Sequence, residues 1–83
     1  MFVREWGRGA PVIALHPLGL DSSGFEGFGR VLARRGLHTL AADLPGFGRT
    51  PAPDVPLRPA ALAEPVIELA RSLDEPPVVL GIS

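Results

Sequence analysis

Apolar and polar positions along the chain follow two different periods, and these predict strands and helices in alternation. Short apolar or β-branched stretches bounded by glycine and proline are typical of strands. They cover residues 2–6, 11–16, 37–42 and 78–82. Apolar residues at helical spacing predict helices over residues 23–35 and about 58–73. The order strand, strand, helix, strand, helix, strand favours an α/β fold with a parallel sheet.

The second strand, residues 11–16, is apolar almost throughout, as expected for a central strand covered on both faces. If the strands at 39–42 and 78–82 pair on its two sides, right-handed crossovers place the helices on opposite faces of the sheet. A crevice then opens at the carboxyl end of the central strand, where such sheets bind ligands. We expect the loop after His16 and the turn at Ser83 to meet there.

Each predicted helix contains a feature with two interpretations. In the first helix, Phe25 and Phe28 lie on the apolar stripe, and we expect them to pack against the sheet rather than to bind a ligand. In the second helix, Pro65 falls inside the apolar stripe. Either the helix is kinked at Pro65 or its regular part begins there.

Length and charge narrow the class of protein. The 83 residues have room for one small domain, residues 1–83, and 46% of them are hydrophobic. A formal net charge of -1 gives no electrostatic reason to expect nucleic acid or an anionic membrane as a partner. Glu5 stands where a signal peptide carries positive charge, and the apolar stretches are only strand-sized. We therefore expect a cytoplasmic protein.

Several kinds of cofactor site are excluded by the residues themselves. The chain has no cysteine and two histidines, too few for a thiolate site or a zinc cluster. Gly46 and Gly48 begin like a dinucleotide fingerprint, but Pro51 replaces the third glycine and no helix follows at once. A phosphate-binding loop of the Walker type needs a lysine, which the chain lacks. We expect neither a cofactor nor a metal ion.

The last strand ends in Gly81-Ile82-Ser83, the first half of the G-x-S-x-G motif of a nucleophilic serine. Gly81 would give the backbone room for a sharp turn, although a strand that merely happens to end in Gly-x-Ser is the commoner explanation of three such residues. A serine nucleophile also needs backbone N–H groups to bind the oxyanion. In the loop after His16, Pro17 has no N–H, so the candidate donor is Leu18.

Three other polar residues have both a catalytic and a structural interpretation. His16, at the end of a buried strand, more often forms structural hydrogen bonds than transfers protons. His38, at the start of a strand, is expected to be exposed. Asp43 follows a strand, where a carboxylate serves either in catalysis or, more commonly, as an acceptor for N–H groups of its own loop.

In combination, the motifs resemble the N-terminal part of an α/β-hydrolase. The resemblance rests on a strand leading into His-Pro-Leu-Gly at 16–19, on the loop at 43–50, and on a strand leading into Gly-x-Ser at 81–83. The loop matches the family's D-x-P-G-x-G-x-S segment, with Thr50 in place of serine. In the first motif, Pro17 replaces the usual glycine. The resemblance covers nearly the whole chain.

The resemblance implies roles for four residues. Ser83 matches the nucleophile, and Leu18 matches the residue whose backbone N–H completes the oxyanion hole. Asp43 belongs to a structural turn and is not the triad acid. Because the family's triad runs in the order Ser, Asp or Glu, His, both partners of Ser83 are expected downstream, and His16 is not the base.

The implied function is that of an esterase-like serine hydrolase acting on small carboxylic esters through an acyl-enzyme. The isolated 83 residues are expected to be inactive because the catalytic acid and histidine are missing from them. Two alternatives stay open. One is an inactive remnant or a binding half that needs a second polypeptide, such as the C-terminal part of the same fold. The other is a lyase or acyltransferase on the same scaffold.

Overall fold

The computed structural model describes residues 1–83, which form four strands, two α-helices and a short 3-10 helix. The strands are β1 (Val3–Trp6), β2 (Ala10–Leu15), β3 (Leu37–Ala42) and β4 (Val78–Gly81). The helices are η1 (Ser22–Phe25), α1 (Glu26–Arg34) and α2 (Pro59–Arg71). All the elements predicted from the periodicity are present. The proline-rich and glycine-rich segment between β3 and α2 is irregular, as such a composition requires.

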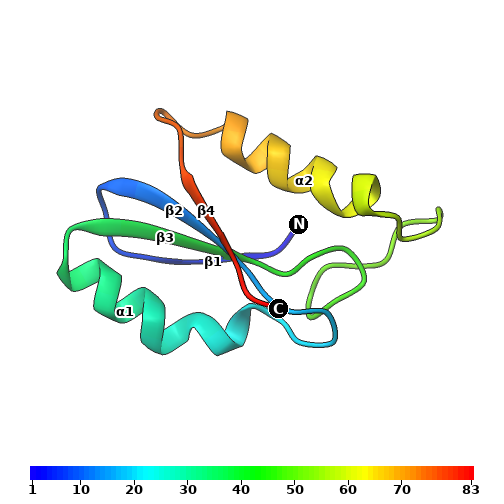
Figure 1. Ribbon diagram of the computed structural model, residues 1–83, viewed down its shortest axis with the longest axis horizontal. Helices are drawn as coiled ribbons and strands as arrows, with labels where there is room; N and C mark the ends of the chain where they lie inside the picture. The colour runs from blue at the N-terminus through cyan, green and yellow to red at the C-terminus, as the bar shows by residue number, and fades with distance from the viewer.

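The four strands form one sheet in the order β1-β3-β2-β4. β2 pairs in parallel with β3 on one side and with β4 on the other, so the predicted central position of β2 is confirmed. The two helices cover opposite faces of this sheet, also as predicted (Figure 1). The carboxyl ends of β2, β3 and β4 therefore share one edge.

The predicted parallel pairing holds for β2, β3 and β4, whereas β1, for which no direction was predicted, runs antiparallel to β3. Only residues 7–9 separate β1 from β2, and a parallel connection needs a dozen or more residues. These three residues arch over the start of β3 to reach its far side. Gly7 and Gly9 make this close crossing possible, because a Cβ on either would collide with the carbonyl oxygen of Leu37 or of Gly36.

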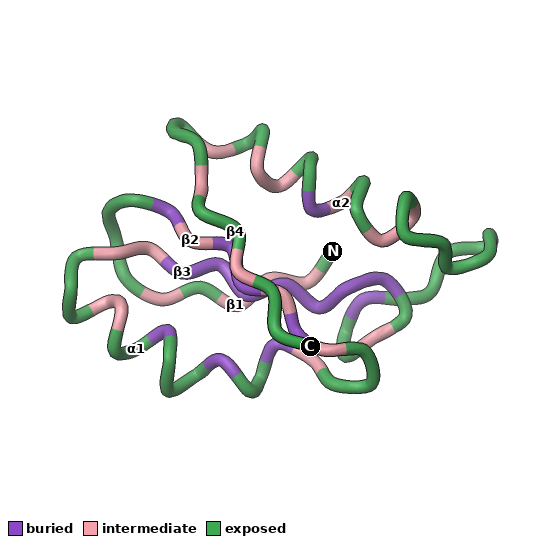
Figure 2. The backbone as a smooth tube through the Cα atoms, viewed as in Figure 1, coloured by how far each residue is buried: buried purple, intermediate pink, exposed green.

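Alternate residues of the central strands supply two separate cores. On the α2 face, Ile13 and Leu40 pack with Leu44 and Val66. On the α1 face, Ala14 and Ala41 pack with Phe25. Figure 2 shows the buried positions concentrated in β2, β3 and the segment just after β3, whereas α2 and β4 are mostly exposed. The best-buried part of the molecule is thus the part that leads into the shared edge.

Of the two phenylalanines expected to pack against the sheet from η1 and α1, only one does so. Phe25 is 8% exposed and packs against the sheet as predicted, but Phe28 is 38% exposed. The two rings remain in contact, with centroids 6.1 Å apart. The prediction that Phe28 belongs to the core is therefore wrong.

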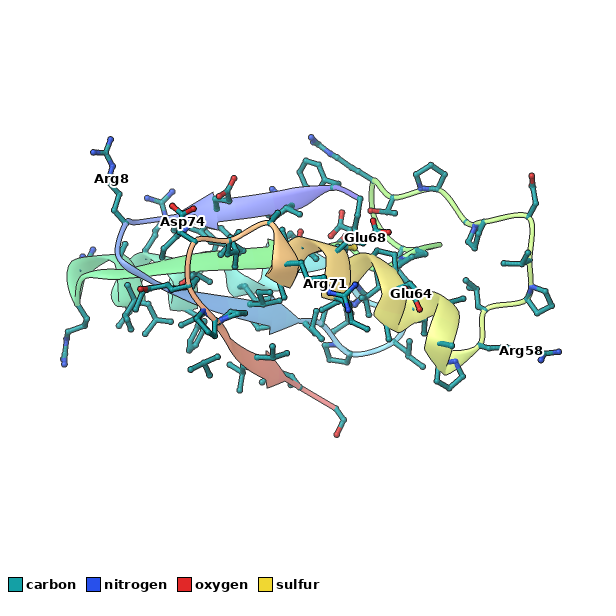
Figure 3. All side chains as sticks on the ribbon, turned by 90° about the horizontal axis from the view of Figure 1, so that it is seen from above. Arg8, Arg58, Glu64, Glu68, Arg71 and Asp74 are labelled. Atoms are coloured by element: carbon teal, nitrogen blue, oxygen red, sulfur yellow. The ribbon has the colours of Figure 1, made fainter.

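Helix α2 begins at Pro59 and continues through Pro65 to Arg71. The interpretation that its regular part begins at Pro65 is therefore wrong. Glu64, Glu68 and Arg71 are exposed and lie on the outer surface of the helix, as seen from above in Figure 3. Neither α-helix has the length and apolar character needed to cross a membrane.

Candidate active site

Three chain segments converge at the carboxyl ends of the parallel strands: residues 16–21 after β2, residues 43–50 after β3, and residues 82–83 after β4. The Ile82 N–H donates to the Leu15 carbonyl oxygen at 3.2 Å, which holds the end of the chain against the end of β2. Ile82, the residue before Ser83, thus lies next to the start of the first segment and lines a pocket with Pro17 and Leu20.

Two pockets flank the segment at 16–21, which we call the β2 loop. The first, of about 360 Å³, is mainly apolar and lies between this loop, α1 and β4, with Phe25, Phe28 and Ile82 in its walls. The second, of about 400 Å³, lies between the β2 loop and the segment at 43–50, which we call the β3 loop. The β2 loop thus stands between two open spaces.

His16 is buried, and both of its ring nitrogens are engaged by the backbone. Nδ1 lies 2.8 Å from the Pro17 carbonyl oxygen, and Nε2 lies 3.0 Å from the Leu44 nitrogen. The Leu44 N–H can only donate, so Nε2 accepts and Nδ1 carries the hydrogen that it donates to Pro17. The prediction that His16 is a structural hydrogen-bonder is confirmed.

Asp43 is 1% exposed and binds amides from two loops. Its Oδ1 accepts the Ser22 N–H at 2.7 Å and its Oδ2 accepts the Arg49 N–H at 2.9 Å. Burial alone would raise the pKa of this carboxyl, but the hydrogen bonds from Arg49 and Ser22 and the charge of Arg4 outweigh it and lower the pKa. Asp43 is therefore an ionised structural acceptor, which confirms the non-catalytic interpretation.

The β3 loop is folded tightly around this carboxylate. Gly48 has a φ of +52°, and a Cβ at this position would collide with the Asp43 carboxylate. Thr50 Oγ1 donates to the Asp43 carbonyl oxygen at 2.6 Å and accepts the Phe2 N–H at 2.9 Å. The Asp43 N–H in turn donates to the Phe2 carbonyl oxygen at 2.9 Å. The chain thus fixes Asp43 from its backbone as well as from its side chain.

A second carboxylate, Asp21, lies at the end of the β2 loop and caps η1. Its Oδ1 accepts the Ser23 hydroxyl and backbone N–H, the latter at 2.9 Å. These two hydrogen bonds lower the pKa of Asp21. Because the bonds are local, Asp21 orders the start of η1 without joining the two loops.

The two residues predicted to do chemistry are both accessible. The Leu18 side chain is 70% exposed, and its backbone N–H donates to no acceptor within the chain. Ser83 is exposed and forms no hydrogen bond. Gly81 is the last residue of β4 and has no positive φ, so a sharp bend at Gly81 is not a feature of these residues. The catalytic roles of Leu18 and Ser83 and the turn at Ser83 stay predictions.

No histidine is placed to activate Ser83. His16 is occupied by the backbone, and His38 lies at the opposite end of β3. His38 is not simply exposed as predicted, because its Nε2 lies 2.8 Å from Glu5 Oε1 and its side chain is 25% exposed. It lines the largest pocket, of about 570 Å³, together with Ser72. Ser72 Oγ donates to the Leu69 carbonyl oxygen, so that pocket holds no activated serine either.

Two contributors to the site were not found from the sequence. The Ser22 hydroxyl accepts a hydrogen bond from Arg4 Nε at 3.0 Å, and the Ser22 N–H donates to Asp43. The backbone N–H of Phe2 donates to Thr50 of the β3 loop. These contacts join residues 18 to 48 positions apart, and no local pattern marks them. No group of three or more His, Cys, Asp or Glu side chains lies close enough together to hold a metal ion.

An α/β sheet in which β2, β3 and β4 run in parallel, with loops at the carboxyl ends of these strands, defines a class of proteins that bind ligands at this edge. The model of the α/β hydrolase family matches residues 12–83, and the chain therefore belongs to that family.

Solved structures of this family superpose closely on the chain. An esterase from Exiguobacterium antarcticum has a TM-score of 0.90 at 26% identity, with 99% of this chain and 31% of that one covered. An epoxide hydrolase from Vigna radiata has a TM-score of 0.87 at 28% identity, covering 95% and 26%. The thioesterase domain from the curacin biosynthetic pathway, at 21% identity, shows the fold alone, with a TM-score of 0.89 and coverages of 98% and 32%. The chain spans about a third or less of each.

Proposed function

We propose that this chain forms the N-terminal part of a serine hydrolase that cleaves small carboxylic esters. Ser83 is its nucleophile, and the Leu18 N–H is one donor of its oxyanion hole. The observation that carries the proposal is the hydrogen bond from Ile82 to Leu15, because it brings Gly-x-Ser alongside the β2 loop, in which the Leu18 N–H has no acceptor.

In the proposed reaction, Ser83 Oγ attacks the ester carbonyl carbon and its proton passes to a histidine outside these 83 residues. The bond to the alkoxy oxygen then breaks, the histidine returns the proton to the leaving alcohol, and an acyl-enzyme remains. Water cleaves this intermediate and regenerates Ser83. The Leu18 N–H stabilises the oxyanion that forms in both halves of the reaction.

The type of nucleophile also indicates whether the enzyme cleaves esters or opens epoxides, which is the activity in the name of one structural neighbour. A carboxylate that opens an epoxide leaves an ester, which water can hydrolyse. A serine would leave an ether, which has no carbonyl carbon for water to attack. Ser83 therefore favours an ester substrate. The net charge of -1 gives no electrostatic reason for this enzyme, which we propose is cytoplasmic, to bind nucleic acid or an anionic membrane.

A second candidate is a binding half that works with another polypeptide carrying the rest of the fold. This candidate is favoured by the outer edge of β4, which pairs with no strand. Val78 and Val79 on this strand are 66% and 52% exposed, so a second polypeptide could cover apolar surface there. A lyase or acyltransferase would use the same Ser83 and Leu18 N–H, and product analysis would distinguish it.

The first test is to treat the native protein with a fluorophosphonate and locate the adduct by mass spectrometry. We expect modification of Ser83, abolished by Ser83→Ala. It should persist in Ser72→Ala, the matched control, because Ser72 Oγ donates to its own helix. An adduct on a species heavier than 8.7 kDa supports a longer hydrolase. An unmodified 8.7 kDa species would contradict the proposal.

The 83 residues expressed by themselves provide the complementary measurement. With no base beside Ser83, we expect no burst of chromophore from an activated ester above the rate of the Ser83→Ala variant. A burst that Ser83→Ala removes would show that the residues present suffice for activation, and the assignment of the base to another segment would be wrong.

A further inference from the structure

The β2 loop, which carries the Leu18 N–H, is held at both ends by two consecutive residues of the β3 loop. At its start, His16 Nε2 accepts the Leu44 N–H at 3.0 Å. At its end, the N–H of Ser22 donates to Asp43 Oδ1 at 2.7 Å. Both hydrogen bonds are buried, where water cannot readily replace a lost partner.

Between these two anchors the β2 loop has little to fix it. The only hydrogen bond between its backbone groups runs from the Leu20 N–H to the Pro17 carbonyl oxygen at 3.2 Å. The side chains of Leu18 and Leu20 are 70% and 62% exposed, so packing does not hold them. The position of the Leu18 N–H is therefore set by where the two ends are held.

The anchor at the end of the loop is the more rigid because the Asp43 carboxylate cannot rotate freely. Its second oxygen is bound to the Arg49 N–H at 2.9 Å, and Gly48 lies directly against it. The Ser22 hydroxyl is further held by Arg4 Nε at 3.0 Å. The anchor thus consists of a buried charge with a fixed donor on each oxygen, and such hydrogen bonds are stronger than those between neutral groups.

We propose that Asp43 is a positioning residue of the hydrolase reaction, which fixes the Leu18 N–H where the oxyanion forms. The inference rests on the proposed function. Asp43 touches neither the substrate nor Ser83 and acts through Ser22 on the β2 loop. Because the transition state needs the donor in place, loss of this anchor slows the chemical step more than it weakens ground-state binding.

The test compares Asp43→Asn with Val66→Ala in the native protein. An Asn side chain has one oxygen, so it keeps one acceptor and turns an NH₂ group toward the other backbone N–H. Val66→Ala removes two methyl groups of α2 from the core on the far side of the sheet from Ser22, and it leaves every hydrogen bond of Asp43 in place. It is the matched control for loss of stability alone.

For ester hydrolysis by Asp43→Asn we expect kcat to fall by about 10- to 100-fold, with KM changed by less than about twofold. Val66→Ala should lower Tm, because it leaves a cavity in the core, and keep kcat within about threefold of the native value, because the loop anchors remain. The inference is wrong if both variants lose kcat in proportion to their loss of Tm, or if Asp43→Asn retains the native kcat.

Amide hydrogen exchange provides a readout that does not require activity. Asp43→Asn should raise exchange at the Ser22 N–H, which loses its acceptor, and at the Leu20 N–H, the hydrogen-bonded amide of the β2 loop, while exchange in β2 stays at its native level. If Ser83 proves unreactive but this change is seen, the proposed function fails and the anchor stands. Unchanged exchange across the β2 loop would overturn the inference whatever the activity.

Discussion

Asp43 illustrates how one buried side chain organises two loops. Each of its carboxylate oxygens accepts a backbone N–H, one from residue 22 and one from residue 49. These bonds favour the ionised form, so the pKa in the folded protein lies below the ordinary value of 3.8 despite burial. The folded state therefore binds the proton of Asp43 less readily than the unfolded chain does.

This difference predicts how stability depends on pH. The stabilisation from Asp43 is fully present above pH 3.8 and is lost as the pH falls through the lower pKa of the folded protein. The Tm difference between the native protein and Asp43→Asn, measured by circular dichroism, should be largest near neutral pH and shrink below pH 3.8. A difference that stays constant across this range would show that Asp43 is not ionised in the folded protein.

The sequence was informative for residues whose neighbours in the chain define their setting. The structural roles of His16 and Asp43 could be predicted because each follows a buried strand and faces its own loop. The partners of these residues could not. Leu44 is 28 positions from His16 and Ser22 is 21 positions from Asp43, and such pairings arise only when the sheet brings the loops together.

At the level of elements, hydrophobic periodicity was a good guide to position and a poor guide to direction. The strands and helices lie close to their predicted bounds because each buries a face of its own. The direction of β1 could not be predicted because a short apolar stretch looks the same in parallel and antiparallel pairing. The exposure of Phe28 was missed because helical spacing marks a face without showing what covers it.

Helix α2 contains a proline at a position where helices seldom tolerate one. Pro65 is the seventh residue of α2 and cannot donate a hydrogen bond to the preceding turn. We expect Pro65→Ala to raise the free energy of unfolding by about 1–3 kcal/mol, measured by urea denaturation.

Pro59 is the natural control for this substitution, because it occupies the first turn of α2, where the N–H has no helical partner. Pro59→Ala should change the free energy of unfolding by less than about 0.5 kcal/mol. A loss of stability in Pro65→Ala would mean that packing of the proline ring against the sheet outweighs the missing hydrogen bond.

For the molecule as a whole, the outer edge of β4 is the most exposed part of the sheet. Ile82 turns its N–H toward β2, so by alternation Val79 and Gly81 turn their backbone groups outward. The side chains of Val78, Val79 and Ile82 are between 47% and 66% exposed. An apolar edge of this kind promotes association with other strands.

We therefore expect the 83 residues expressed by themselves to self-associate as their concentration rises, as followed by sedimentation velocity. Val79→Lys should shift association to a concentration about tenfold higher, a change of about 1.4 kcal/mol, because a charged side chain on an edge strand opposes pairing. Val55→Lys places the same charge on a valine of similar exposure, 57%, outside the sheet, and should have no such effect. Equal effects of the two lysines would point to net charge rather than the edge.

The strand order also dictates when this sheet is able to form during synthesis. β1 and β2 leave the ribosome one after the other, but they are not neighbours in the sheet, because β3 lies between them. Neither strand has a partner until residues 37–42 have emerged, and β3 must enter beneath the arch at residues 7–9. The nascent chain therefore carries both strands unpaired until β3 is available to lie between them. Translational pausing after β2 has emerged and before β3 has done so would prolong that interval and expose the early strands to chaperones.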